Sequence, residues 1–178
     1  FILNKNVNQF YLKKMTDNNN INTMEHEFVI KRGGHREEVS FDKIKIRLEA
    51  LCNNLNINAT KITRQIAQEM YNDIHTSELD ELGAQICASL ITEHPDYGIL
   101  ASRISISNHH KNTSPSFSES MRILFENKDI NNNSKPLISE KLYTIVETNK
   151  TKLNDIIKYD RDYFFDYFGF KTLEKSYL

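Results

Sequence analysis

The chain has 178 residues, of which 39% are hydrophobic and 26% are charged, a composition typical of a globular protein rather than of a fibrous or disordered one. Its net charge of -1 gives no overall field that would favour nucleic acid, so any affinity for phosphate has to come from a local cluster. No stretch approaches the ~20 consecutive apolar residues of a membrane helix, so we expect no membrane association.

The first 27 residues are rich in asparagine and show no sustained hydrophobic period, which predicts a disordered tail over 1–27. The two cysteines of the chain, Cys52 and Cys87, come later and form no CxxC pair. We therefore expect neither structural zinc nor a disulfide framework, and a reducing compartment such as the cytoplasm.

Residues 28–43 predict a β-hairpin that leads directly into a capped helix. Apolar residues alternate on both arms of the hairpin: Phe28, Ile30, Val39 and Phe41. Gly33 and Gly34 lie between the arms and can adopt the positive φ angles of a tight turn, and Asp42 is placed as the helix N-cap. Four basic residues crowd the same segment: Lys31, Arg32, Arg36 and Lys43. A small sheet that carries cations beside a helix start is suited to binding polyphosphate.

Four amphipathic helices are predicted next, over about 42–53, over about 60–73, from Thr76-Ser77 to Pro95, and from Pro95 onward. Each carries one apolar stripe at helical spacing; the second stripe is Ile62, Ile66, Met70 and Ile74. Ser77 and Asp80 look like a variant capping box, and Pro95 suits the first position of the fourth helix. Short loops between such helices predict a four-helix bundle capped by the hairpin, a mostly helical α+β fold.

The character of the chain changes after Pro115. A helix is predicted over about 116–127, an asparagine- and lysine-rich loop over 127–135, and a further helical run from the cap Ser139 towards Ile157. Six aromatic residues then fall within the eight residues from Tyr163 to Phe170. Such a cluster has to be buried, and residues 116–178 offer too little to bury it. We therefore expect the chain to stop inside a larger domain.

Several of these segments resemble the ATP-cone, a module at the N-terminus of the class I ribonucleotide reductase large subunit. They are Val29–Ile44, Thr76–Asp80, His94–Tyr97, Ala101–Ile104 and Ser107–Lys111. Residues 159–178 resemble the start of the catalytic part of the same subunit, of eukaryotic or giant-virus type. The resemblance implies three regions: a tail over 1–27, an ATP-cone over 28–115, and the incomplete helical start of the catalytic domain over 116–178.

The resemblance also implies an allosteric site at which ATP keeps the enzyme active and dATP promotes an inhibited oligomer, with both nucleotides bound as Mg²⁺ complexes. The whole enzyme would reduce ribonucleoside diphosphates for DNA synthesis with a radical-generating small subunit, and its catalytic residues would lie outside this chain. Carried over by motif, the nucleotide-binding residues would be Lys31, Arg32, Glu37, Glu38, Val39, Ser40, Phe41, Asp42, Lys43, Thr76, Asp80 and Lys111.

Elementary chemistry supports these implied roles. Lysine and arginine supply charge-assisted hydrogen bonds to a triphosphate, whereas Asp80 has the wrong sign for phosphate. We expect Asp80 to accept a hydrogen bond from the ribose or to help position Mg²⁺, and Asp80→Asn to weaken dATP inhibition more than ATP binding. His109 and His110 are adjacent on a helix and point ~100° apart, so we expect no metal site there.

Two other classes of protein stay open on the sequence. One is a nucleotide-sensing transcription regulator, since such repressors carry ATP-cones, although they place a zinc ribbon ahead of the cone and residues 1–27 contain no cysteine. The other is a helical interaction module without a ligand, in which the basic hairpin is a solvated surface and Thr76, Ser77 and Asp80 are only helix caps. A titration with fluorescent ATP separates this last class from the first two.

Overall fold

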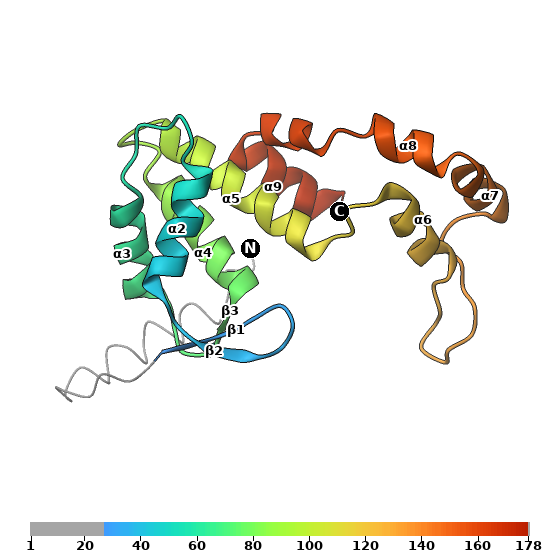
Figure 1. Ribbon diagram of the computed structural model, residues 1–178, viewed down its shortest axis with the longest axis horizontal. Helices are drawn as coiled ribbons and strands as arrows, with labels where there is room; N and C mark the ends of the chain where they lie inside the picture. Colours follow the sequence, from blue (N-terminus) through green and yellow to red (C-terminus); the bar gives the residue numbers. More distant parts are fainter. Residues whose placement is uncertain (1–26, 178) are drawn as a thin grey trace.

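The computed structural model describes residues 27–177, so the tail predicted over 1–27 lies outside the described residues apart from Glu27. Figure 1 shows a helical bundle above a small sheet, and a helical arm that extends away from it. The elements are β1 (Phe28–Ile30), β2 (Arg36–Glu38), α2 (Phe41–Leu51), α3 (Ala59–Glu69), β3 (Ile74–His75), α4 (Thr76–Ser89), α5 (Asp96–Asn112), α6 (Phe117–Phe125), α7 (Glu140–Thr148), α8 (Lys150–Ile156), the 3₁₀ helix η1 (Tyr159–Phe164) and α9 (Tyr167–Ser176).

The sheet contains the predicted hairpin, but its second arm is shorter than expected. Strands β1 and β2 are antiparallel and place Val29 opposite Glu37, so the second arm ends at Glu38 and the prediction that it continues to Phe41 is wrong. The loop between the arms is wider than a two-residue turn, because the Lys31 N–H donates to the carbonyl of His35 at 2.9 Å. Of the two glycines, Gly34 alone adopts a positive φ, of 81°.

A third strand, β3, was not predicted. Its apolar residue, Ile74, falls in the stripe predicted for the 60–73 helix, but α3 ends at Glu69 and Asp73 turns the chain with a φ of 62°. Ile74 then lies parallel to Val29 in β1, which gives the sheet order β2-β1-β3. The apolar residue is buried as expected, through strand pairing rather than through a helix face.

Two predicted helix caps are wrong. The N-cap of α2 is Ser40, whose hydroxyl accepts from the Lys43 N–H at 3.4 Å, and Asp42 lies in the first turn instead. Helix α4 begins at Thr76 without a side-chain cap, so Ser77 and Asp80 form no capping box. The reason is that β3 runs straight into α4, which leaves no loop residue to cap it, and the Asp80 carboxylate is held by cations elsewhere.

The four-helix bundle capped by a small sheet is confirmed. Helices α2 to α5 pack around a core in which Ile62, Leu100 and Ile104 are almost fully buried. A smaller cluster of Val29, Met70 and Ile74 fastens the sheet to the lower end of the bundle. The open seam between sheet and bundle lies at the N-terminal ends of α2 and α4, where backbone N–H groups are not used within the helix.

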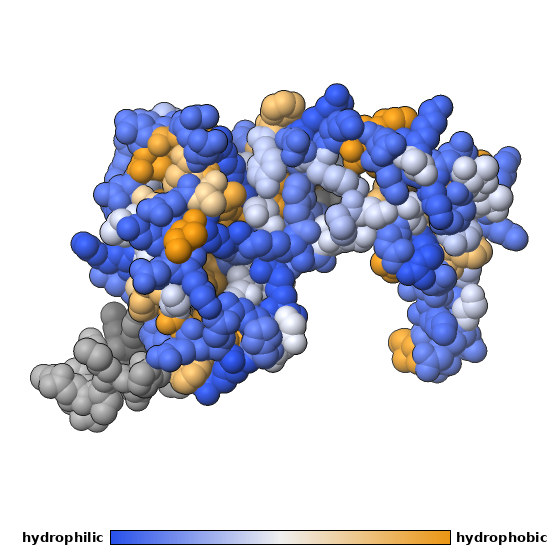
Figure 2. Space-filling view, in the orientation of Figure 1, coloured by the Kyte–Doolittle hydropathy of each residue, from blue (hydrophilic) through white to orange (hydrophobic). Residues whose placement is uncertain are grey.

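The arm, formed by α6 to α9, packs on the bundle mainly along α5, beside which α9 and η1 lie (Figure 1). Lys171 of α9 also pairs with Glu81 of α4 at 2.6 Å. The helical run predicted from Ser139 is divided at Asn149 into α7 and α8. The aromatic cluster is buried only in part: Phe170 is buried, whereas Phe164 is 87% and Phe168 66% exposed. Figure 2 shows apolar side chains on the surface of both the bundle and the arm. Within residues 27–177 no helix is long and apolar enough to cross a membrane.

Candidate functional site

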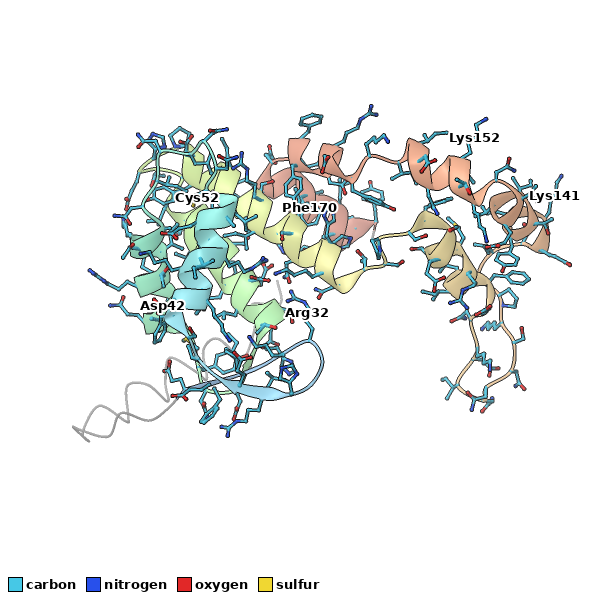
Figure 3. The ribbon with its side chains drawn as sticks, viewed as in Figure 1. Arg32, Asp42, Cys52, Lys141, Lys152 and Phe170 are labelled. Carbon is cyan, nitrogen blue, oxygen red and sulfur yellow. The ribbon has the colours of Figure 1, made fainter. Side chains whose placement is uncertain are left out.

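A cavity of about 200 Å³ lies at the seam between the hairpin, the start of α2, the start of α4 and the end of α5. Its lining residues are Val29, Lys31, Arg32, Glu37, Glu38, Val39, Ser40, Lys43, Ile44, Arg47, Thr76, Leu79, Asp80 and Lys111. Every residue implied by the family resemblance is therefore brought to this one cavity, except Phe41 and Asp42. These two lie at the exposed start of α2, and Figure 3 shows Asp42 well apart from Arg32.

Asp80 is the centre of charge in this cavity, with only 11% of its side chain exposed. Arg47 binds it with both arms of the guanidinium: Nε lies 2.6 Å from Oδ1 and Nη2 lies 2.9 Å from Oδ2. Arg32 Nη2 reaches Oδ2 at 3.2 Å, and Lys111 Nζ lies 3.8 Å from the same oxygen. Three cations surround one carboxylate, so the group keeps a net positive charge that favours an anion.

Glu37 is the second carboxylate of the cavity and lies at its rim. It is held by Lys43 and by Lys31, whose Nζ is 3.3 Å from Oε2. Hydrogen bonds from Lys43 and Lys31 hold the pKa of Glu37 below its ordinary value. Both lysines are thus already paired with a carboxylate, and a polyphosphate that entered the cavity would compete with Glu37 for them.

Arg32 joins the hairpin to the end of α5. Its Nε donates to Asn112 Oδ1 at 2.8 Å and its Nη2 to Asn108 Oδ1. The Asn108 amide in turn donates to the carbonyl of Ser77, in the first turn of α4, at 3.0 Å. Hairpin, α4 and α5 are therefore tied together at the cavity by one chain of polar contacts.

Arg47 and Asn108 are the residues that sequence reasoning missed. Arg47 stands four residues after Lys43 in α2, which places both cations on one face of the helix, and this spacing was a usable signal. Asn108 had no comparable signal, because an asparagine near a helix end is common and its contact with Arg32 spans 76 residues.

A second hollow, of about 680 Å³, lies at the opposite end of the bundle and is wide open. It is lined by Glu49 and Glu93 among others, and no lysine or arginine is among its lining residues. The two lysines beside it are already paired, Lys45 with Glu49 at 3.7 Å and Lys61 with Glu93 at 2.5 Å. Its acidic lining makes it unsuited to phosphate. Cys52 lines it as well, but burial raises the pKa of this thiol, and that of Cys87 to about 12, so neither is a thiolate at neutral pH.

The histidine pair at the end of α5 is used for packing. His109 meets Phe170 of α9 edge-on, and His110 Nε2 lies 2.7 Å from Asp162 Oδ2 in η1. Across residues 27–177 there is no group of three or more His, Cys, Asp or Glu side chains that could hold a metal ion.

Comparison with known proteins agrees with this geometry. Residues 27–112 match the family model described as ATP cone domain. This part of the chain is an ATP-cone. It contains the sheet, all four bundle helices and every lining residue of the 200 Å³ cavity.

The chain is also homologous to reductase large subunits over more than the ATP-cone. It is 51% identical over 155 residues to the ribonucleoside-diphosphate reductase large subunit of Monkeypox virus, which is 85% of this chain and 20% of the relative. It is 47% identical over 154 residues to the large subunit of Danio rerio, and 46% over 155 residues to large chain 2 of Saccharomyces cerevisiae. The chain spans about a fifth of the length of these relatives, at 18–20%.

Proposed function

We propose that the cavity binds the triphosphate of ATP or dATP as an allosteric effector, through the side chains of Lys31, Arg32, Lys43 and Lys111. The observation that carries this proposal is the convergence of these four cations on one cavity at the N-terminal ends of two helices, where backbone N–H groups also favour an anion. The acidic lining of the larger hollow argues against binding there.

In this proposal Asp80 contacts the ribose of the nucleotide rather than its phosphates. A carboxylate that is mostly buried and held by arginine cannot approach phosphate without repulsion, but it can accept a hydrogen bond from a ribose hydroxyl. Mg²⁺ would arrive with the nucleotide, because the phosphates bind it and both Asp80 and Glu37 are already paired with cations.

Binding requires the rim to open. The cavity is below the 300–1,000 Å³ of most small-molecule sites, and the contacts of Glu37 with Lys31 and Lys43 close one side of it. We infer that the triphosphate displaces Glu37 from the two lysines. The walls formed by Val29, Ile44 and Leu79 leave apolar surface beside the charges for the rest of the nucleotide.

For the whole protein we propose the large subunit of ribonucleoside-diphosphate reductase, which would make deoxyribonucleotides in the cytoplasm. It would act with a radical-generating small subunit and as a homo-oligomer of large subunits that the effectors control. The supporting finding is identity of 46–51% to proteins of that name from viruses and eukaryotes. We divide the chain into an ATP-cone over 28–115 and a segment of the catalytic domain over 116–178. The two free cysteines belong to the ATP-cone, so we assign no catalytic residue to this chain.

The proposal is tested by titrating the 178-residue chain with fluorescent mant-ATP. We expect saturable binding, and a loss of at least tenfold in affinity for the double variant Lys31→Ala/Arg32→Ala, because two charge-assisted contacts are removed. Arg36→Ala is the matched control, since Arg36 lies on the same hairpin but pairs with Asp73 outside the cavity. No binding by the unsubstituted chain would favour the ligand-free interaction module instead.

A further inference from the structure

We propose that Arg47 is a positioning residue of the nucleotide site, which holds Asp80 in the orientation that receives a ribose hydroxyl. The inference rests on the proposed function and adds to it a residue that no family motif supplied. Arg47 lies in the middle of α2, with 27% of its side chain exposed, and makes the shortest contacts to Asp80 of any cation at the site.

The geometry of the pair differs from that of the other cations. Arg47 binds Oδ1 and Oδ2 at once, whereas Arg32 and Lys111 reach only Oδ2, at 3.2 and 3.8 Å. A bidentate guanidinium fixes the plane of a carboxylate, which a single contact to one oxygen does not. Arg47 therefore controls how Asp80 is turned, and the other two cations control mainly its charge.

The packing beneath the pair makes such control necessary. A small inner cavity of about 40 Å³, separate from both hollows described above, lies below Asp80 and Arg47. Both residues line it together with Ile44 and Leu79. These four residues also line the outer cavity, so the ion pair lies between an open site and an apolar hole in the core. Because a void adjoins Asp80 on its inner side, packing there constrains its rotamer less than a close-packed wall would. The Arg47 fork supplies the missing constraint.

The hydrogen bonds around Oδ1 indicate what the held carboxylate can receive. Among the described residues, Arg47 Nε is the one donor recorded on Oδ1, while Oδ2 is approached by Arg47, Arg32 and Lys111. A carboxylate oxygen can accept a second hydrogen bond. Oδ1 is therefore the atom at which we place the ribose hydroxyl.

The test compares ATP with 2′,3′-dideoxy-ATP, which lacks both ribose hydroxyls, as ligands of the 178-residue chain in calorimetric titrations. In the unsubstituted chain we expect ATP to bind at least about fivefold more tightly, the value of one buried hydrogen bond. In Arg47→Lys, which keeps the charge but loses the fork, we expect this ratio to fall to within twofold. Inorganic tripolyphosphate, which has no sugar, should bind both chains with affinities within about threefold of each other.

Arg36→Lys is the matched control, because Arg36 binds Asp73 with the same two-armed geometry, at 2.5 and 3.2 Å, outside the cavity. It should leave the ratio unchanged, and thermal melts should show that both variants fold. If the ratio of ATP to dideoxy-ATP affinity in Arg47→Lys equals that of the unsubstituted chain, the positioning role of Arg47 is overturned, while the ribose contact of Asp80 stands. Equal affinity of the unsubstituted chain for ATP and the dideoxy analogue would overturn the ribose contact and the inference with it, whereas no binding of any nucleotide would overturn the proposed function.

Discussion

At the scale of single residues, the cavity is not a plain basic patch, because each of its cations is paired with one of two carboxylates. Asp80 and Glu37 together engage Arg32, Arg47, Lys111, Lys31 and Lys43. The two acids have different places, since Asp80 is mostly buried and Glu37 lies at the rim. A phosphate therefore displaces Glu37 from its cations more easily than it displaces Asp80. Displacing Glu37 frees both Lys31 and Lys43 to bind the phosphate.

This balance predicts the effect of Glu37→Gln. The substitution removes the charge that competes for Lys31 and Lys43, so the affinity for tripolyphosphate at pH 7 should rise a few-fold. Glu49→Gln in α2, which lies outside the cavity and pairs with Lys45 at 3.7 Å, is the control for the loss of one negative charge. Unchanged or weaker binding by Glu37→Gln alone, measured by calorimetry, would show that Glu37 does not compete with the anion.

The pH dependence of Glu37 has a definite sign. Hydrogen bonds from Lys43 and Lys31 lower its pKa in the folded chain below the ordinary value of 4.5. What it contributes to folding stability is thus fully present above that value, and is lost as the pH falls through the lower folded pKa. The difference in free energy of unfolding between the unsubstituted chain and Glu37→Gln, measured in urea, should accordingly be constant from pH 8 to pH 6.

At the scale of elements, the start of α2 depends on Ser40, and this can be separated from Asp42. Ser40→Ala removes the side-chain acceptor for the Lys43 N–H and should lower the free energy of unfolding by about 1 kcal/mol. Asp42→Ala removes only a first-turn charge and should cost less, about 0.3–0.5 kcal/mol. Urea unfolding of both variants checks the order, and a larger loss for Asp42→Ala would restore Asp42 as the cap.

Gly83 in α4 offers a stabilising substitution. An alanine Cβ there would lie 3.2 Å from Cδ1 of Ile66, which is tight, but the 40 Å³ cavity is lined by both residues and gives the end of Ile66 room to move. Replacing a mid-helix glycine gains about 1 kcal/mol in helix propensity. We expect Gly83→Ala to raise the free energy of unfolding by about 0.5–1 kcal/mol, measured in urea. A decrease would mean that Ile66 cannot shift.

The elements also show how far the sequence predicts this fold. The apolar stripes predicted α2 to α5, because helical periodicity is a local property that each segment carries in its own residues. Strand β3 has only two residues and is defined by the pairing of Ile74 with Val29, 45 positions away. No local sequence pattern could therefore predict it. The Arg32 contacts with Asn108 and Asn112 are long-range in the same way. The clustered cations therefore predicted a shared cavity, whereas the hydrogen bonds that join Arg32 to α5 could not be predicted from the sequence.

At the scale of the whole molecule, two helices that line the cavity also contact the arm: α4 through the ion pair of Glu81 with Lys171, and α5 through the residues at its C-terminal end. Asn108 and Lys111 face the site, while His109 and His110 contact α9 and η1. All four lie within the last turns of one helix. A change at Arg32 on nucleotide binding therefore has a short physical route to the arm.

This arrangement predicts the behaviour of His110→Ala. The variant loses the contact with Asp162 and the edge-on packing against Tyr163, so backbone amides of residues 159–164 should exchange hydrogen faster, by about tenfold. The affinity for mant-ATP should stay within twofold, since His110 does not line the cavity. His75→Ala, at an exposed position in the sheet, is the control. Unchanged exchange over 159–164 would show that the contact does not hold η1 to α5.

Binding of an adenine nucleotide at the seam of sheet and bundle can be followed residue by residue, by mapping the amide chemical shifts of the isotope-labelled chain during titration with MgATP. If the nucleotide binds there, the amides of residues 31–43, 76–80 and 108–112 should show saturable shifts. We expect no shifts beyond noise in residues 56–60 and 93–97, most of which line the acidic hollow at the other end of the bundle. Saturable shifts confined to 56–60 and 93–97, with residues 31–43 unaffected, would contradict binding at the seam.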